Sequence, residues 1–367
     1  MRSWTSKDEA YMAQALSLAR RGQGRVEPNP MVGCVLVKRG RVVGRGFHRR
    51  FGGPHAEVNA LRQAGSRARG ATAYVTLEPC CHFGKTPPCT DALIAAGIGR
   101  VIAAMRDVNP KVAGRGFAAL RAADIRCDVG ILEEQARSLN APFIKFFMQH
   151  RPYVILKWAQ SLDGKIATRS GDSRWISAAI SRKEVHRLRA RVDAIIVGVD
   201  TVLRDDPQLT ARAVPRLRIA SRIILDSKLR TPLKSRLIRS AQQTPTIIAT
   251  SRRSGRSLAL LQAAGCEILM MPAHRTGVSL TALLGELHRR RMTNVLVEGG
   301  GRVLGSFIEQ GLADEARIFI APRLIGGENA PGPLRNLGPQ NMRGLPKGQV
   351  TEDVLLGPDR CYTIRFR

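Results

Sequence analysis

The sequence predicts an α/β protein of two domains, and three observations lead to this prediction. Runs of apolar and β-branched residues alternate along the chain with stretches of helical periodicity. The 367 residues are too many for one ordinary core and suit two. The pattern breaks near residues 149–152 and then restarts. We therefore expect domains at 1–150 and 151–367, the first built on a mostly parallel sheet covered on both faces.

The elements of the first half follow from periodicity and turn residues. Apolar positions from Ala10 to Leu18 have helical spacing, and Pro28-Asn29-Pro30 marks a turn before a buried apolar run. The expected elements are a helix at 8–20, a hairpin of strands at 31–37 and 42–44, a helix from about Pro54, strands at 73–77 and 100–105, and a helix after Cys89.

The second half repeats the alternation. Its expected strands lie at 153–157, 194–199, 223–226, 246–249, 294–298 and 316–321. Helical stretches at 181–191 and 280–291 lie between them. This pattern is typical of a second α/β domain.

Composition excludes several classes of protein. Hydrophobic residues make up 44% of the chain, which excludes a disordered tail protein. No apolar run approaches the ~20 residues that a membrane helix needs, and the N-terminus lacks the apolar core of a signal peptide. Seven cysteines are an odd number at low density, so thiol or metal chemistry is favoured over a disulfide framework. We expect a cytoplasmic protein without a membrane partner.

The net charge of +30 invites a nucleic-acid hypothesis, which its distribution weakens. The chain has 48 Arg and 11 Lys, but residues 1–150 carry a net +12 and the remainder +18, with no basic tract. A nucleic-acid binder usually gathers its positive charge on one face. A solvated basic surface, or attraction to phosphorylated small molecules, accounts equally well for the charge, and we expect no nucleic-acid partner.

Three short motifs in the first half point to a catalytic zinc site. They are Pro54-His55-Ala56-Glu57, Glu78-Pro79-Cys80 and Pro87-Pro88-Cys89. One His and two Cys are a known set of three ligands that leaves a fourth position on zinc for water. Zinc lowers the pKa of such a water, and Glu57 is placed to carry its proton to a leaving amine.

A structural zinc site is the alternative. Such a site closes with a fourth protein ligand, for which Cys81 or His82 is available. Glu57 favours the catalytic interpretation, because a Glu two residues after the His serves catalysis and adds nothing to a structural site.

The first half resembles the deaminase part of the bifunctional riboflavin-biosynthesis deaminase/reductases. The resemblance is carried by residues 77–89, Pro28-Asn29-Pro30-Met31-Val32-Gly33, Gly46-Phe47-His48 and residues 106–116, although Cys81 stands where the family usually carries Ser. It implies a cytidine-deaminase-like three-layer fold, with His55, Cys80 and Cys89 as zinc ligands and Glu57 as the catalytic residue. It also implies substrate contacts from Asn29, His48, His82 and Lys85.

A strand that ends in three glycines is the clearest feature of the second half. Residues 294–297 precede Gly299-Gly300-Gly301, and a helix follows. Glycines let backbone N–H groups approach a phosphate at a helix N-terminus. The motif alone is weak evidence, since it does not match G-x-G-x-x-G and lies late in the domain.

Neighbouring segments resemble the reductase part of the same family, a dihydrofolate-reductase-like domain. The segments are 157–167, 170–177, 199–210 and 224–227. The implied NADPH contacts are Ala159, Trp175, Thr201, Asp205, Ser227, Gly300, Gly301, Arg302, Val303, Leu304, Gly305 and Ser306. The implied substrate contacts are Ser173, Arg189, Leu209, Arg212 and Glu298. Arg189 and Arg212 can each bind a phosphate through two nitrogens, and Glu298 can accept from sugar hydroxyls. Asp205 is the only candidate for a catalytic acid.

The resemblance implies a bifunctional enzyme that uses Zn²⁺ and NADPH. The first domain would deaminate 2,5-diamino-6-(5-phosphoribosylamino)pyrimidin-4(3H)-one, and the second would reduce the ribosyl group to ribityl; the family is usually homodimeric. Two alternatives stay open: a polynucleotide (tRNA-type) zinc deaminase, and a nucleic-acid-binding protein with a degenerate deaminase fold. The second domain argues against the former, and the intact zinc set argues against the latter.

Overall fold

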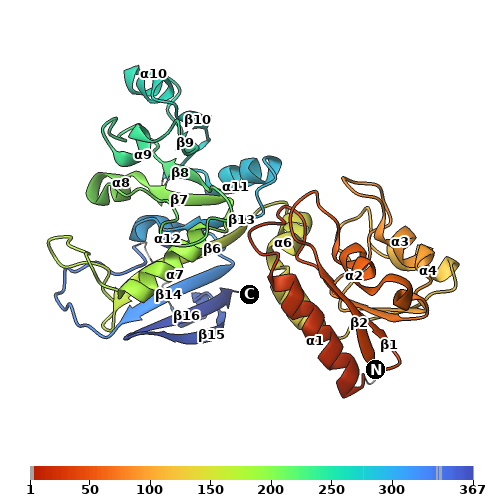
Figure 1. Cartoon of the computed structure of the whole chain (residues 1–367). Helices are drawn as coiled ribbons and strands as arrows, with labels where there is room; N and C mark the ends of the chain where they lie inside the picture. The colour runs from red at the N-terminus through yellow and green to blue at the C-terminus, as the bar shows by residue number, and fades with distance from the viewer. Residues whose placement is uncertain (1–3, 276, 336–337, 339–340, 367) are drawn as a thin grey trace. The chain divides into compact units, whose positions relative to one another are not determined.

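The structure is a computed structural model that describes residues 4–275, 277–335, 338 and 341–366. The chain divides into two compact units, Met1–His150 and Arg151–Arg367 (Figure 1). Each unit is described by itself below. Over the described ranges, no helix combines the length and the apolar character that crossing a membrane would require.

Over its described residues, 4–150, the first unit is a five-stranded sheet with six α-helices. Its strands are β1 (Gly33–Lys38), β2 (Arg41–Phe47), β3 (Thr72–Val75), β4 (Arg100–Ala103) and β5 (Arg126–Val129), in the order β2-β1-β3-β4-β5. Its helices are α1 (Ser6–Arg20), α2 (Ala56–Ala64), α3 (Cys89–Ala95), α4 (Arg115–Ala122), α5 (Glu133–Leu139) and α6 (Ala141–Gln149).

Alternating side chains of this sheet enter two separate cores, which makes the unit three-layered. Cys34 and Leu36 of β1 pack in the core that includes residues of α2, α3 and α4. Val35 and Val37, the residues between and after them, pack in the core that includes residues of α1, α5 and α6. This alternation is the period of two expected of a strand that is buried on both faces. It confirms the cytidine-deaminase-like three-layer prediction.

The pairing in this sheet is only partly parallel. The pairs β3–β4 and β4–β5 are parallel, as expected, but β1 pairs antiparallel with both β2 and β3. The hairpin from Gly33 to Phe47 accounts for the β1–β2 pair, because a short turn can only join antiparallel strands. The mostly parallel sheet expected here is therefore half parallel.

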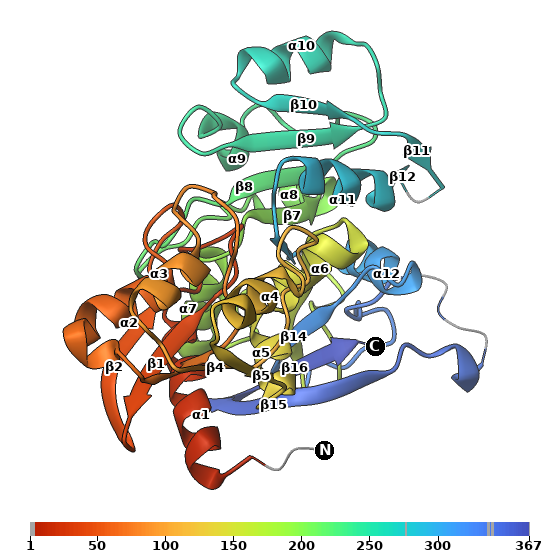
Figure 2. The same ribbon diagram turned by 90° about the vertical axis from the view of Figure 1, so that its right-hand side faces the viewer.

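The second unit is a nine-stranded sheet with the order β10-β9-β8-β7-β13-β6-β14-β16-β15, and Figure 2 shows β7 to β10 side by side. Its strands are β6 (Tyr153–Ser161), β7 (Ala194–Gly198), β8 (Ser221–Leu225), β9 (Thr246–Thr250), β10 (Glu267–Met270), β13 (Asn294–Val297), β14 (Glu315–Ala321), β15 (Gly348–Leu356) and β16 (Asp359–Phe366). A small separate hairpin is formed by β11 (Ala273–His274) and β12 (Gly277–Val278).

In the described part of this unit, six α-helices accompany the sheet. They are α7 (Ala179–Arg189), α8 (Val199–Asp205), α9 (Arg236–Arg239), α10 (Arg256–Ala263), α11 (Leu280–Arg289) and α12 (Gly301–Glu309). The first seven strands in the sheet order pair in parallel, and only β16 and β15 are antiparallel to their neighbours. The core contains apolar residues of β6, β7, β13, α11 and α12. The carboxyl ends of these parallel strands meet at one edge, where α/β proteins usually bind ligands.

Candidate functional site

The three predicted zinc ligands lie together in the first unit. His55 caps the N-terminus of α2, Cys80 lies in the loop after β3, and Cys89 is the first residue of α3. His55 Nδ1 lies 3.5 Å from Cys80 Sγ and 3.3 Å from Cys89 Sγ, and the three ligand atoms fall within 4.8 Å of one another. These separations suit one zinc ion with tetrahedral ligands.

The N-terminus of α3 prepares Cys80 for a metal. The backbone N–H of Cys89 donates to Cys80 Sγ at 3.3 Å. The hydrogen bond from the Cys89 thiol, with smaller help from His55, outweighs burial and lowers the pKa of the Cys80 thiol to about 4. Because zinc binds thiolates, the lowered pKa of Cys80 favours metal binding, whereas the hydrogen bond to Cys80 raises the pKa of the Cys89 thiol.

No fourth protein ligand completes the set within the described part of the chain. The only metal-binding group of His, Cys, Asp and Glu found there is His55, Cys80 and Cys89. The Cys81 thiol instead lies 3.9 Å from the carbonyl oxygen of Lys111. The arrangement therefore matches the open, catalytic type of zinc site rather than the closed, structural one.

Glu57 lies in the first turn of α2 and is only 3% exposed. Its Oε2 atom is buried and has no hydrogen-bond partner among the residues that the structure describes. Burial, followed by the charge of Cys80, raises the pKa of Glu57. A buried carboxyl group with a free oxygen and a raised pKa is suited to taking up and releasing a proton.

Sequence reasoning missed Thr86, which orients the histidine ligand. Its Oγ1 lies 3.4 Å from His55 Nε2, the ring nitrogen that faces away from both thiols. Zinc-binding histidines usually donate this second N–H to an acceptor, which holds the ring and its tautomer. Thr86 lies within residues 77–89, the segment that carries the family resemblance, but nothing in its spacing indicated a contact with His55.

The predicted substrate residues Asn29 and His48 contact each other beside the zinc ligands. His48 is 2% exposed, and its Nδ1 lies 3.1 Å from the Pro54 carbonyl oxygen. Its ring packs edge-on against the His55 ring, with 5.0 Å between the two ring centres. Burial lowers the pKa of His48, so the neutral ring donates from Nδ1 and accepts at Nε2 from Asn29 Nδ2, 3.2 Å away. The two hydrogen-bonded side chains form a polar surface beside the zinc ligands.

The other two predicted substrate residues lie in the loop between Cys80 and Cys89. Lys85 is exposed, with its Nζ 4.2 Å from the centre of the Phe51 ring. His82 Nδ1 is buried and has no hydrogen-bond partner among the described residues. Both groups therefore have hydrogen-bonding capacity that the folded chain leaves unused.

Sequence analysis also missed the role of Glu78, which anchors the residues that lead into this loop. Its buried carboxylate accepts hydrogen bonds from the backbone N–H groups of Asp107, Gly114 and Phe117, at 3.0–3.2 Å. Gly116 packs so closely that an added Cβ would lie 2.1 Å from the Pro79 carbonyl oxygen. The residues just before Cys80 are thus held against the segment that leads into α4.

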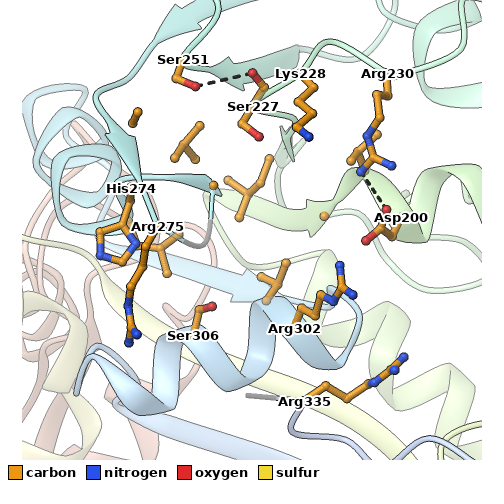
Figure 3. Close-up of a pocket in the computed structure, with 18 of the residues that line it drawn as sticks. Asp200, Ser227, Lys228, Arg230, Ser251, His274, Arg275, Arg302, Ser306 and Arg335 are labelled. Atoms are coloured by element: carbon orange, nitrogen blue, oxygen red, sulfur yellow. Dashed lines mark hydrogen bonds and ion pairs between the residues drawn. The ribbon is translucent and has the colours of Figure 1, made fainter. Parts of the chain in front are cut away.

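The second unit contains a cavity of about 880 Å³ at the carboxyl ends of its parallel strands (Figure 3). Four of the predicted cofactor residues line it, namely Ser227, Arg302, Val303 and Ser306. Residues that sequence reasoning missed complete the lining, among them Lys228, Arg230, Ser251, Arg275 and Arg335. This volume is in the range of pockets that hold a cofactor.

The glycine turn forms the N-terminus of α12 at this cavity. Gly300 caps the helix, and its N–H donates to Thr201 Oγ1 at 2.9 Å, which joins two predicted cofactor contacts. The neighbouring Gly299 has no room for a side chain, because a Cβ would lie 2.9 Å from Val303 Cβ. Bare backbone at a helix N-terminus fits the pyrophosphate of a dinucleotide.

Leu304 is an exception among the predicted cofactor residues of α12. It is 1% exposed and packs in the hydrophobic core instead of lining the cavity. On a helix that lies between a core and a cavity, only some positions of each turn can face the ligand. The Leu304 side chain therefore faces the core, and the predicted cofactor contact at this residue would have to come from its backbone.

Arg189, a predicted substrate contact, is paired with Glu298, another predicted substrate contact. Its Nε and Nη2 atoms bind the two carboxylate oxygens of Glu298, at 2.6 and 2.7 Å, and both side chains are nearly buried. Burial would raise the pKa of Glu298, but Arg189 outweighs it and lowers that pKa. Two charges buried together pair with each other because either alone would be costly, so in this structure the Nε and Nη2 atoms of Arg189 are bound to Glu298. The predicted substrate contact of Arg189 stays a prediction.

Lys157 lies beside this ion pair and was not among the predicted site residues. Burial lowers the pKa of its ammonium group, partly offset by the charge of Glu298. Its Nζ lies 5.8 Å from the centre of the Phe319 ring. Arg212, in contrast, is exposed and binds Gln208 Oε1 at 2.8 Å, so it remains accessible to an anion.

The remaining predicted contacts lie outside the cavity lining. Trp175 is 63% exposed beneath the Arg182 guanidinium, 4.5 Å away, and Leu209 is buried. Ser173 and Ala159 are half-buried. Burial raises the pKa of Asp205, the candidate acid, although Arg174 and Arg204 partly oppose this effect.

Comparisons with known proteins identify the family. Residues 152–357 match the model of the RibD C-terminal domain, and residues 5–105 match that of the cytidine and deoxycytidylate deaminase zinc-binding region. The riboflavin biosynthesis protein RibD of Aquifex aeolicus is 48% identical over 87% of this chain and 88% of its own. The chain belongs to the RibD family.

Solved structures of RibD proteins agree with this assignment. Acinetobacter baumannii RibD has a TM-score of 0.87 at 38% identity, over 98% of this chain and 99% of that one. A diaminohydroxyphosphoribosylaminopyrimidine deaminase/5-amino-6-(5-phosphoribosylamino)uracil reductase from Thermotoga maritima has a TM-score of 0.86 at 37% identity, with the same coverage.

Membership of the RibD family defines the activity. The chain is a bifunctional deaminase and reductase of riboflavin biosynthesis, with zinc and NADPH as its cofactors. The comparisons do not favour the two nucleic-acid alternatives, because RibD relatives match both halves of the chain.

Proposed function

We propose that the first unit deaminates 2,5-diamino-6-(5-phosphoribosylamino)pyrimidin-4(3H)-one and that the second unit reduces the ribosyl group of the product to ribityl. The substrate follows from the activity for which the Thermotoga maritima relative is named, that of a diaminohydroxyphosphoribosylaminopyrimidine deaminase/5-amino-6-(5-phosphoribosylamino)uracil reductase. The observation that supports the first step best is the open set of three ligands beside the buried Glu57.

His55, Cys80 and Cys89 hold the zinc ion, which when bound supplies a water of lowered pKa. Glu57 would take up a proton at its carboxylate and deliver it to the amine that leaves from the pyrimidine. Its free Oε2 atom is the group that exchanges the proton. Asn29 and His48 orient the pyrimidine edge, while His82 and Lys85 bind the ribose phosphate.

In the second unit, the cavity holds NADPH, whose chemistry when bound is hydride donation. The N-terminus of α12 and Arg302 receive its pyrophosphate. Glu298, kept ionised by Arg189, accepts hydrogen bonds from the sugar hydroxyls, and Lys157 lies beside them. Arg212 is the exposed cation that remains for the substrate phosphate.

We also propose that the protein is a homodimer. The edge strand β15 has eight consecutive exposed residues, including Val350, Val354 and Leu355. An exposed edge strand with apolar side chains is a site for pairing with a second chain. Light scattering that gave the mass of one chain would contradict this proposal.

The cytoplasm is the compartment we propose for the enzyme. All seven cysteines are free, and two of them serve the zinc site as thiolates. Thiols remain reduced in the cytoplasm. Recovery of the enzyme in another fraction of its own cells would contradict this proposal.

The test follows ammonia release and NADPH absorbance in one incubation with the diamino substrate. We expect Glu57→Gln to lower ammonia release at least ~100-fold, because the amide cannot carry the proton. NADPH oxidation with substrate that is already deaminated stays unchanged. The control is Glu134→Gln, which alters an exposed acid of the same unit.

Two results would refute the assignment of one reaction to each unit. One is loss of both activities together in Glu57→Gln. The other is full ammonia release by that variant. Lack of ammonia release by the unchanged enzyme, when it is loaded with zinc, would refute the proposed substrate.

A further inference from the structure

We infer that Lys228, together with Ser227, makes the reductase half selective for NADPH over NADH by binding the 2′-phosphate of the adenosine ribose. The inference rests on the proposed function of the second unit. It assigns a specificity role to a residue on the wall of the cavity, in the turn that follows β8.

The cavity contains more positive charge than a dinucleotide pyrophosphate requires, but part of that charge is already neutralised. Arg230 binds Asp200 Oδ1 at 2.8 Å, and Arg275 binds Glu309 Oε1 at 2.5 Å. Each of these cations therefore has its own carboxylate at the cavity wall, as the dashed line from Arg230 shows in Figure 3.

Three cations of the cavity lining remain. Over the part of the chain that the structure describes, the side chains of Lys228, Arg302 and Arg335 form no hydrogen bond or ion pair. Arg302 is the second residue of α12, and the side chain of Arg335 lies against Gly301, 2.7 Å from where its Cβ would be. Both belong to the pyrophosphate end of the cavity.

Lys228 lies at another wall. In Figure 3 it extends from the turn after β8, beside Ser227, whereas Arg302 and Arg335 lie on the side of α12. The cavity thus offers two separated places for an anion. One is the helix N-terminus with two arginines, and the other is an ammonium group next to a hydroxyl group.

A ligand that fits both places carries two separated phosphate groups. NADPH has a pyrophosphate and, on its adenosine ribose, a phosphate monoester. NADH has a neutral hydroxyl group at that position. A lysine binds a phosphate as a point charge, and a serine hydroxyl adds a donor. Lys228 is exposed, so its ammonium group is solvated in the free protein. NADPH would offer it a phosphate and NADH only a hydroxyl group, and this difference favours the phosphorylated coenzyme.

Calorimetry with two probes tests the inference in the full-length enzyme. The probe 2′,5′-ADP carries the 2′-phosphate, and 5′-AMP lacks it. We expect Lys228→Ala to weaken binding of 2′,5′-ADP roughly 10- to 100-fold, the usual range for one charge-assisted contact, and to leave 5′-AMP unchanged. In kinetics, kcat/KM should fall for NADPH and stay the same for NADH.

Lys234→Ala is the matched control, because Lys234 is an exposed lysine nearby that does not line the cavity. Unchanged binding of 2′,5′-ADP by Lys228→Ala would overturn the inference, and so would an equal loss for both probes. An unchanged enzyme that bound neither NADPH nor 2′,5′-ADP would instead refute the proposed cofactor site, and the inference with it.

Discussion

The hydroxyl group of Thr86 holds the zinc ligand His55 in its orientation. Thr86 Oγ1 lies 3.4 Å from His55 Nε2, while His55 Nδ1 faces the two thiols. The hydroxyl group favours the tautomer whose proton is on Nε2, which leaves the lone pair of Nδ1 free for the metal.

Removing that hydroxyl group should weaken zinc binding. We expect Thr86→Val to lower zinc affinity about 10- to 100-fold, the usual cost of losing a partner of a metal-binding histidine. Thr86→Ser keeps the hydroxyl group and should retain nearly full affinity. Competition with a coloured chelator measures both values. Equal zinc affinity of the valine and serine variants would contradict the assigned role.

Asp107 gives the first unit a pH-dependent stability. It is 8% exposed, and burial raises the pKa of its carboxyl group to about 7. The folded state then keeps its proton while the unfolded state, with a pKa near 3.8, loses it. Stability therefore falls as pH rises from about 4 to about 7, by up to ~1.4 kcal/mol per pH unit, and then levels off.

Asp107→Asn should remove this dependence, because the amide stays neutral and its oxygen can still accept from the Asn109 N–H, 2.8 Å away. Relative to the unchanged protein, we expect the variant to be stabilised more at pH 8 than at pH 5.5. Calorimetry of the first unit's unfolding at both pH values measures this. Asp124→Asn, at an exposed acid, is the control. An equal difference at both pH values would contradict the prediction.

Site residues were predictable where the chemistry is concentrated in a short motif. His55 and Glu57 are two residues apart, so one helix start places both, and the cysteines follow in a recognisable loop. Lys228 had no such signal, because the cavity lining comes from several separate segments. The pairing of Arg189 with Glu298 was equally hidden, since 109 residues separate them.

At the scale of elements, strands with apolar runs were predicted well. Runs such as those in β7 and β13 are fully buried, so hydrophobicity alone indicated them. The strand β15 was missed because eight of the nine residues in Gly348–Leu356 are exposed and its apolar residues do not form one continuous run. Only its pairing with β16 makes it a strand, and sequence periodicity does not report such pairing. The four-residue strand β5, with one fully buried position, was missed for the same reason.

At the scale of the whole molecule, each unit has its own cores. The cores of the first unit contain only residues up to Phe147, and the large core of the second begins at Val154. We expect 1–150 and 151–367, produced as separate chains, to fold, because each buries its own apolar surface.

Activity measurements on the separate chains check this expectation. The first should release ammonia from the diamino substrate, and the second should oxidise NADPH when it is given deaminated substrate. Circular dichroism shows whether each chain folds. A folded first chain without deaminase activity would mean that its active site needs residues of the second unit.

The strand order of the second unit also affects how the chain folds during synthesis. Strand β6 pairs only with β13 and β14, and β13 begins at Asn294, more than 130 residues after β6 has left the ribosome. Until then β6 is an apolar strand without its partners, which makes a nascent chain prone to aggregation. In the first unit, all five strands of the sheet have been synthesised once the chain reaches Val129. The deaminase half can therefore fold before strand β13 of the reductase half has been synthesised. In a chain that terminates before residue 294, only the deaminase half could fold.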